Sequence, residues 1–107
     1  MRVAAVVSDL TLFSRIESAA TAAGADLVRV DSPSDPSGEF DLVLVDWSAR
    51  QPDWTDALRA LSASRVIVFG PHTDLDAHAA ARDARLGPMM ARSKLVTSLP
   101  DLVAHAT

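Results

Sequence analysis

Two aspartates stand where short apolar segments of the chain end. Asp46 closes the run "DLVLVD" of residues 41–46, and Asp9 follows the apolar run of residues 3–7. A carboxylate can act as a nucleophile, but an aspartate in a loop can also cap the helix that follows it. Each residue is therefore either a reacting group or an ordinary loop residue, and the elements around it must decide between the two.

Five short apolar runs predict β-strands. They are Val3–Val7, Asp26–Val30, Asp41–Val45, Val66–Gly70 and a weaker run at Pro88–Ala91. Three of these runs are too uniformly apolar to have one face in water, which is typical of a parallel sheet that helices cover on both sides.

Helical patterns lie between most of these runs. Apolar residues at three- and four-residue steps predict helices over residues 12–23, 54–61, 75–86 and 99–106. Gly24 predicts the end of the first helix, Thr73 or Asp74 predicts the cap of the third, and Pro100 fits only near the beginning of the last. Residues 31–40, "DSPSDPSGEF", have no such pattern, so we expect a loop or a single turn there.

This alternation predicts one α/β domain over residues 1–107. We expect a flavodoxin-like, doubly wound (βα)5 sandwich with a parallel sheet of order 2-1-3-4-5 and a second helix that is short or missing. In that order the first and third strands are neighbours, so Asp9 and Asp46 would face each other across one crevice at the carboxyl ends of the strands.

Over essentially its whole length the chain resembles the receiver domain of bacterial two-component response regulators. The matching segments are "VVSD" at residues 6–9, "DLVLVD" at 41–46, "VIVFG" at 66–70 and "ARLGPMMARS" at 84–93. The resemblance implies that Asp46 is a possible phosphoacceptor, which attacks a phosphohistidine, and that Asp9 and Asp46 are possible ligands of Mg²⁺. Mg²⁺ prefers such oxygen ligands, and it neutralises the transferred phosphoryl group. No other cofactor is implied.

The chain departs from the family's pattern around this site. Ser8 replaces one of two acidic residues, Gly70 stands in place of Ser or Thr, and Arg92 stands in place of Lys. A guanidinium can clasp a carboxylate through two parallel hydrogen bonds, so we expect Arg92 to hold Asp46 in an ion pair. Ser8 and His72 are expected at the rim of the crevice.

Two other groups of residues have ordinary structural explanations. The segment "HTDLDAH" alternates histidine and aspartate like a set of zinc ligands, at His72, Asp74, Asp76 and His78. The helical pattern from Leu75 would scatter these side chains around a helix axis, so zinc is not expected. Trp47 and Trp54 either cover the edge of the core or contact a partner, and the sequence leaves both alternatives open.

These departures predict a stand-alone pseudo-receiver with a degenerate phosphorylation site, which is not an enzyme and acts by protein–protein contact in two-component or phosphorelay signalling. The expected partners are a histidine kinase, a downstream effector or a second copy of the chain. The expected contact surface is formed by the family's fourth helix, fifth strand and fifth helix, with His78, Arg82, Arg85 and Lys94.

Two alternatives to this function stay open. One is a phosphorylatable, Mg²⁺-dependent response regulator that uses Asp46. The other is a flavodoxin-like module that binds a small ligand or a nucleotide, although no glycine-rich loop follows any strand.

Composition argues against several other classes. The chain has 14 acidic and 10 basic residues, a net charge of -4 and no basic cluster, so nucleic acid is not an expected partner. It has no cysteine, which excludes disulfides, thiolate metal sites and a thiol nucleophile. Its apolar runs are far shorter than the roughly 18 residues that span a bilayer, so we expect a soluble, cytoplasmic protein without membrane contact.

Overall fold

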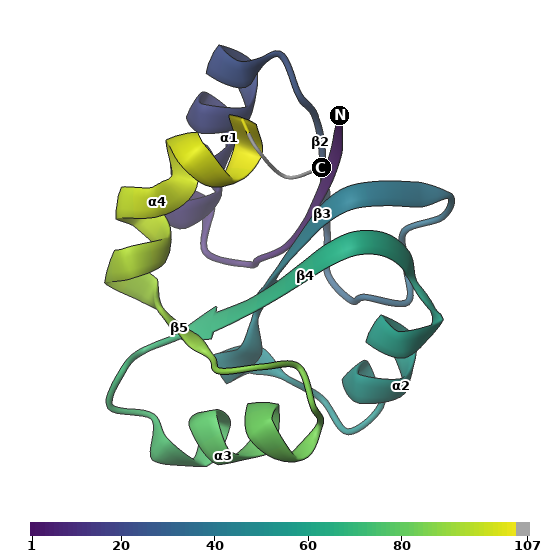
Figure 1. The fold of residues 1–107 in the computed structure, drawn as a ribbon, viewed down its shortest axis with the longest axis vertical. Helices are drawn as coiled ribbons and strands as arrows, with labels where there is room; N and C mark the ends of the chain where they lie inside the picture. The colour runs from purple at the N-terminus through teal and green to yellow at the C-terminus, as the bar shows by residue number, and fades with distance from the viewer. Residues whose placement is uncertain (105–107) are drawn as a thin grey trace.

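The computed structural model describes residues 1–104 and contains a five-stranded sheet (Figure 1). Its strands are β1 (Arg2–Val6), β2 (Asp26–Val30), β3 (Glu39–Asp46), β4 (Ser62–Gly70) and β5 (Met90–Ala91). All strand pairs are parallel, and the order is β2-β1-β3-β4-β5. The predicted α/β class and strand order are confirmed.

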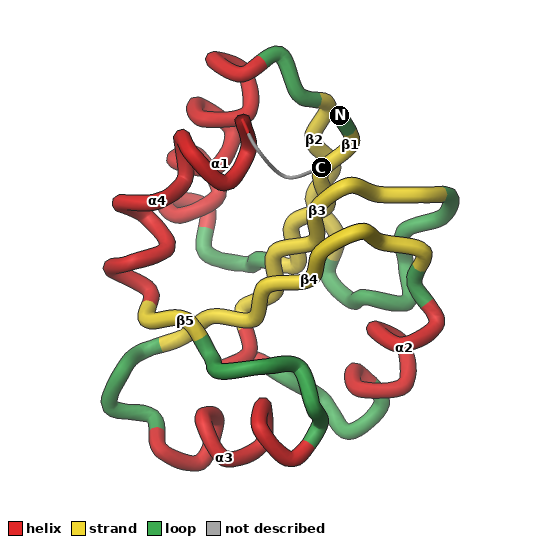
Figure 2. The backbone as a smooth tube through the Cα atoms, viewed as in Figure 1, coloured by secondary structure: helices red, strands yellow, loops and turns green. Residues whose placement is uncertain are grey.

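Two α-helices cover each face of the sheet (Figures 1 and 2). Helices α1 (Leu10–Ala23) and α4 (Arg92–Ala104) pack on one face, and α2 (Trp54–Ala60) and α3 (Leu75–Asp83) pack on the other. This is the doubly wound, flavodoxin-like arrangement that was expected. Within residues 1–104, none of the helices combines the length and the apolar character needed to cross a membrane.

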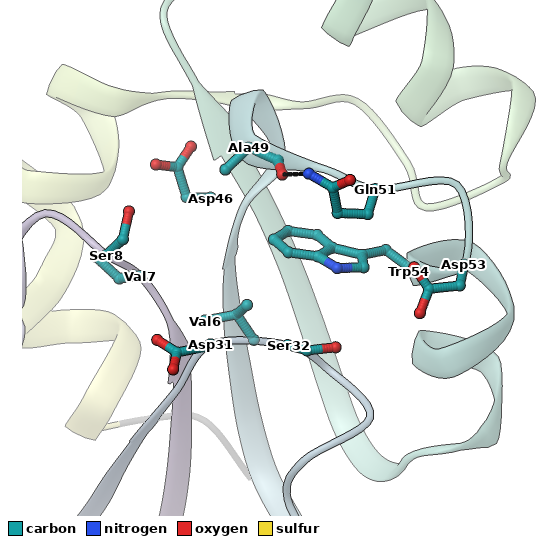
Figure 3. Close-up of a pocket in the computed structure, with 10 residues that line it drawn as sticks. All are labelled: Val6, Val7, Ser8, Asp31, Ser32, Asp46, Ala49, Gln51, Asp53 and Trp54. Atoms are coloured by element: carbon teal, nitrogen blue, oxygen red, sulfur yellow. Dashed lines mark hydrogen bonds between the residues drawn. The ribbon is translucent and has the colours of Figure 1, made fainter.

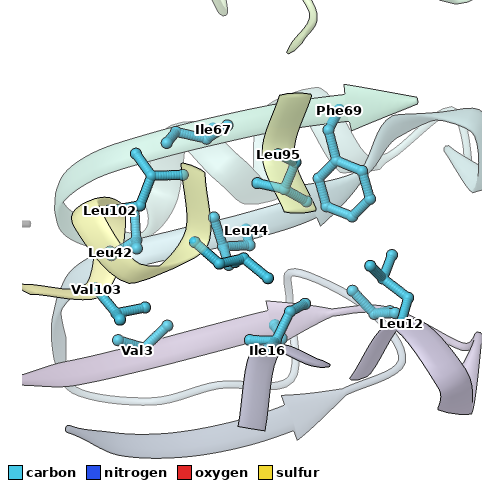
Figure 4. Packing of buried hydrophobic residues seen from close by; sticks show 13 residues of the cluster. Val3, Leu12, Ile16, Leu42, Leu44, Ile67, Phe69, Leu95, Leu102 and Val103 are labelled. Carbon is cyan, nitrogen blue, oxygen red and sulfur yellow. The ribbon is translucent and has the colours of Figure 1, made fainter. Parts of the chain in front are cut away.

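Strand β3 shows why "DLVLVD" is apolar throughout. Leu42 and Leu44 point into the core under α1 and α4, whereas Val43 and Val45 point into the core under α2 and α3. Alternate side chains of a strand face opposite sides of a sheet, so a strand covered on both sides needs apolar residues at every position. Figure 4 shows the first of these cores, in which side chains from strands and helices meet around Leu44.

The crossover from β2 to β3 contains no helix, as predicted. Residues 31–38 form a loop with turns (Figure 2), and Pro33 is the buried residue of this loop. A loop therefore stands where a complete doubly wound domain would place a helix.

The last helix begins earlier than the sequence pattern predicted. Helix α4 starts at Arg92, directly after β5, whereas the expected helix began at Leu99. The prediction was wrong because Pro100 was taken for a start signal, although buried Leu95 already continues the apolar stripe towards β5. Pro100 therefore lies in the helix interior, where its missing N–H leaves the carbonyl of Val96 without a helical partner. The end of the predicted range, residues 105–106, lies outside the described residues.

Strand β4 is also longer than predicted. It begins at Ser62, four residues before the apolar run, because Ser62 and Ala63 pair with Glu39 and Phe40 of β3. Ser62 is exposed and Ala63 is half-buried, so the strand conformation of these two residues depends on the ladder with β3 rather than on an apolar pattern.

Candidate functional site

The candidate site lies at the carboxyl edge of the sheet, where β1 and β3 end side by side. Val6 of β1 pairs with Val45 of β3, so Asp46 comes one residue beyond this pair and Ser8 and Asp9 follow two and three residues after Val6. The strand order brings the two aspartates to the same edge, as the sequence predicted. The cavity that Asp46 lines is not lined by Asp9, however, so the structure does not place the two carboxylates across one crevice.

Asp46 is the charged residue that the structure buries most deeply within residues 1–104, with an exposed fraction of 8%. Its Oδ1 accepts hydrogen bonds from the backbone N–H of Ser48 at 3.2 Å and from the Ser48 hydroxyl at 2.6 Å. These bonds cap the short 3₁₀-helix η1 (Trp47–Ala49). Asp46 thus has a structural role as a loop-start residue, and its Oδ2 accepts no hydrogen bond from the part of the chain that the structure describes.

Asp9 is the N-cap of α1. Its Oδ1 accepts hydrogen bonds from the backbone N–H groups of Thr11 at 2.9 Å and Leu12 at 3.1 Å, and its Oδ2 accepts a hydrogen bond from the Arg92 guanidinium. Both carboxylate oxygens are therefore engaged. The capping alternative considered for this residue is confirmed.

Arg92 pairs with Asp9 and not with Asp46, so the predicted Arg92–Asp46 ion pair was wrong. The reason is the arrangement of the helices. Asp9 precedes the first turn of α1, and Arg92 begins α4, the helix that packs beside α1 on the same face of the sheet (Figure 1). The two residues are 83 positions apart in the chain but are neighbours in space.

The environment of Asp9 lowers the pKa of its carboxyl group. The largest cause is the hydrogen bond from the backbone N–H of Leu12, followed by the hydrogen bond from Arg92, and partial burial opposes both. These interactions stabilise the ionised form, which is the form that caps α1 and pairs with Arg92.

We predict that Asp9 makes the fold sensitive to acid. A carboxyl group whose pKa is lower in the folded state contributes stability that is fully present above its unfolded pKa, about 3.9. This contribution is lost as the pH falls through the lower, folded pKa. Asparagine also caps helices but carries no charge, so Asp9→Asn should unfold at a lower urea concentration at pH 6 and show a smaller further loss between pH 4 and pH 2. Urea unfolding across this pH range measures both effects.

Asp83→Asn is the matched control, because Asp83 is exposed and makes no side-chain hydrogen bond or ion pair within residues 1–104. Its urea midpoint should follow that of the wild type at each pH. Equal pH slopes for wild type and Asp9→Asn would show that the Asp9 interactions do not contribute to folding stability.

Gly70 ends β4, next to Asp46. A Cβ at this position would lie 3.1 Å from Sδ of Met89 and 3.7 Å from Cβ of Ser48. The space that a side chain at position 70 would enter is therefore bordered by the buried thioether of Met89. The hydroxyl beside Asp46 comes from Ser48, which the sequence reasoning missed. The spacing of Asp46 and Ser48 was a signal for this contact, because an aspartate often accepts a hydrogen bond from the backbone N–H two residues later.

The structure separates the two residues expected at the rim. Ser8 lines a cavity together with Asp46, whereas exposed His72 lines a different groove with Pro71, Arg92 and residues of the start of α4. The segment after His72 is helical, as expected, with Asp74 as the cap that accepts a hydrogen bond from the N–H of Ala77. Within residues 1–104, no three histidine or acidic side chains come together in a group that could hold a metal ion.

The cavity beside Asp46 has a volume of about 340 Å³ (Figure 3). It opens between the ends of β1 and β3, the loop that follows β2, and the segment between η1 and α2. Besides Ser8 and Asp46, its polar lining consists of Asp31, Ser32, Gln51 and Asp53, together with the indole of Trp54. The sequence reasoning did not assign the residues after β2 and η1 to the site, because three separate connections bring them together.

Both tryptophans belong to the core. Trp47 has an exposed fraction of 2% and Trp54 of 5%, and both pack in the cluster under α2 and α3. Of the two alternatives for these residues, the structure supports the one in which both tryptophans cover the edge of the core. Trp54 also borders the cavity.

The fold and the site define an α/β protein of flavodoxin-like topology with an acidic cleft at the carboxyl edge of its sheet. Compared with known proteins, the chain matches no protein-family model. No curated protein shows significant sequence similarity to it.

Proposed function

We propose that this chain is a receiver-like module of bacterial two-component or phosphorelay signalling that acts by protein–protein contact and without phosphorylation of Asp46. The observation that carries the proposal is the position of Arg92. Its guanidinium forms an ion pair with the carboxylate of Asp9, the residue that would have to bind Mg²⁺ for phosphoryl transfer to Asp46.

The electrostatics of phosphoryl transfer support this proposal. A transferring phosphoryl group needs cationic neutralisation next to the attacking oxygen, and a divalent ion normally supplies it. A Mg²⁺ ion could reach the Asp9 carboxylate only after displacing Arg92, because Oδ1 already accepts two backbone N–H groups. Arg92 is permanently charged, and it therefore takes the place of the metal ion as the partner of Asp9.

The surroundings of Gly70 support the same conclusion. A receiver that responds to phosphorylation needs a hydroxyl side chain that can move towards the phosphoryl group. Position 70 has no side chain, and Met89 already lies 3.1 Å from where a Cβ would be. The Ser48 hydroxyl already donates to the Asp46 carboxylate at 2.6 Å, and Ser8 is the other hydroxyl that lines the cavity with Asp46.

The contact surface in this proposal comprises α3, β5 and the start of α4. Arg82, Arg85 and Lys94 are exposed there and form no ion pair within the described residues, and His78 is half-buried. Leu75 of α3 has an exposed fraction of 74%. Asp76 and Asp83 are exposed on the same helix, so the surface has mixed charge beside an exposed leucine. Such a surface fits a partner protein of complementary mixed charge, and a second copy of the chain is the alternative partner.

One observation favours the rival function, a phosphorylatable response regulator. The Oδ2 atom of Asp46 is free of hydrogen bonds from residues 1–104 and borders an open cavity with Ser8. A carboxylate oxygen in this position is geometrically available for attack on a phosphorus atom.

An NMR titration distinguishes the two functions. Magnesium is added first, and then beryllofluoride, which mimics an aspartyl phosphate, to the wild type and to Asp46→Asn. The proposal predicts no saturable amide shifts around Asp9, Asp46, Gly70 and Arg92 in either protein. Saturable shifts at these residues in the wild type alone would overturn the proposal and establish Asp46 as a phosphoacceptor.

A further inference from the structure

We infer that the cavity beside Asp46 is a binding site for an organic cation that also carries a hydrogen-bond acceptor, such as an arginine side chain with its neighbouring amide carbonyl. This inference does not depend on the proposed signalling role. It rests on the shape, the charge and one unpartnered donor of the cavity in Figure 3.

The shape of the cavity follows from the missing helix. Residues 31–38 cross from β2 to β3 as a loop, so Asp31 and Ser32 form one wall where a helix would otherwise begin. The segment Ala49–Trp54 forms the opposite wall, and Val6 and Val7 contribute apolar surface between them. A volume of about 340 Å³ is at the lower end of the range of small-molecule sites.

The charge of the cavity selects a cation. Three of its lining residues are aspartates, and none is lysine, arginine or histidine. Asp31 is already paired with Arg29 at 3.2 Å. Asp46 and Asp53 have no cationic partner within residues 1–104, so the cavity holds two uncompensated carboxylates. One of these, Asp46, is more than nine-tenths buried, and a buried carboxylate gains most from a bound cation.

Trp54 supports a bound ligand independently of the charge of the cavity. Its side chain is almost fully buried, with an exposed fraction of 5%, yet its indole N–H makes no hydrogen bond to the described residues. Among these residues, the only fully enclosed side-chain polar atom without a partner is Nε1 of Trp47, so Nε1 of Trp54 remains accessible. In Figure 3 the ring nitrogen lies on the edge of the indole that faces Ser32 and Asp53.

A tryptophan whose ring is mostly buried normally finds an acceptor for its indole N–H, and the accessible N–H of Trp54 can receive one from a ligand in the cavity. The same indole also offers its π-face, which attracts ammonium and guanidinium groups. In Figure 3 the indole lies between Asp46 and Asp53, so the cationic end of a ligand would meet one of these carboxylates while a carbonyl oxygen of the same ligand accepts from the Trp54 N–H.

An organic cation fits the lining better than a metal ion does. A metal ion bound tightly by the protein needs several ligands around one point, and within residues 1–104 no three acidic or histidine side chains are grouped in this way. A guanidinium spreads its charge and its donors over a plane and can donate two parallel hydrogen bonds to a single carboxylate.

The test is a metal-free NMR titration that follows the two indole N–H signals of the protein. The probe is N-acetyl-arginine methylamide, and its neutral analogue N-acetyl-citrulline methylamide tests the need for charge. Agmatine, which has the guanidinium but no carbonyl, tests the need for the acceptor. The enclosed Trp47 serves as an internal reference, and Trp54→Phe assigns the signals.

We expect the arginine probe to shift the Trp54 indole signal saturably and to leave Trp47 nearly unchanged. Agmatine should bind several-fold more weakly, and the citrulline probe should not bind. Asp53→Asn should weaken binding about three- to fivefold, because it removes one partly exposed charge-assisted contact. The control Asp56→Asn, in the first turn of α2 and outside the cavity, should leave the affinity unchanged.

An arginine probe that leaves the Trp54 signal unmoved would overturn the inference. Equal binding of the citrulline probe would overturn the role of charge, and equal binding of agmatine would overturn the role of the acceptor. A blocked Ala-Arg-Ala peptide separates the two sources of this chemistry: binding supports the site and assigns it to a protein side chain, and binding of the single-residue probe alone supports the site and assigns it to a free metabolite-sized cation. Neither magnesium nor beryllofluoride is present, so this test can fail while the proposed function stands.

Discussion

Replacement of Arg92 by glutamine is expected to create a magnesium site. In the wild type, the Arg92 guanidinium holds the one Asp9 oxygen that does not cap α1. Glutamine removes the charge and frees this oxygen, so we expect Asp9 and Asp46, which follow the ends of neighbouring strands, to share a hard cation. We expect Mg²⁺ to bind Arg92→Gln at least about tenfold more tightly than the wild type, because the variant removes a competing cation from one of two oxygen ligands. Amide shifts in a magnesium titration measure both affinities.

Two further variants test the cause of this change. Arg82→Gln removes a similar charge from an exposed arginine of α3 that has no carboxylate partner within the described residues, and it should not create the site. The double variant Arg92→Gln/Asp46→Asn should lose the gained affinity, because one of the two carboxylates is gone. If Mg²⁺ binds the wild type and Arg92→Gln equally, the Arg92–Asp9 pair does not block the metal position, and the main support for the proposed function is lost.

Replacement of Pro100 by alanine is expected to stabilise the fold by about 1–2 kcal/mol. Proline inside a helix is about 3 kcal/mol less favourable than alanine, and part of this difference is offset because proline also restricts the unfolded chain. Pro100 lies inside α4, which runs from Arg92 to Ala104, and its side chain is exposed. Alanine restores the N–H that can donate to the carbonyl of Val96, and it removes no buried contact. Urea or thermal unfolding at neutral pH gives the free energy directly.

Pro88→Ala is the matched control, because Pro88 is also exposed but lies in the loop before β5. It should be neutral or slightly destabilising, since it only increases the freedom of the unfolded chain. A Pro100→Ala variant no more stable than the wild type would mean that α4 does not form a continuous helix through residue 100.

The strands and helices with a strong apolar period could be predicted from the sequence. Runs such as Val3–Val7 and Asp41–Val45 are apolar on both sides because both faces of the sheet are covered, and this requirement acts on each residue separately. Gly24 ends α1 with a φ of 70°, a conformation that glycine adopts without strain, so the local sequence was sufficient there too.

The extensions of these elements could not be predicted in the same way. The first residues of β4 are mostly polar, and they form a strand because β3 offers them a ladder of hydrogen bonds. The first turns of α4 carry mostly polar residues, and their place is set by Leu95, which is buried against side chains from distant strands. In both places, contacts between segments outweigh weak local preference.

The features of the site also fall into two groups, those that the sequence predicts and those that only the tertiary structure decides. Asp46 closes an apolar strand and Asp9 follows another, so their position at one edge of the sheet can be derived from the order of residues and the rules of parallel sheets. Which carboxylate receives the Arg92 guanidinium depends on the packing of α1 beside α4, and the cavity next to Asp46 depends on three loops that approach from different strands. Ion pairs and cavities depend on distances in space between residues that are far apart in the chain, so only the tertiary packing decides these features of the site. The strands and the aspartates that follow them can be predicted from the local sequence pattern.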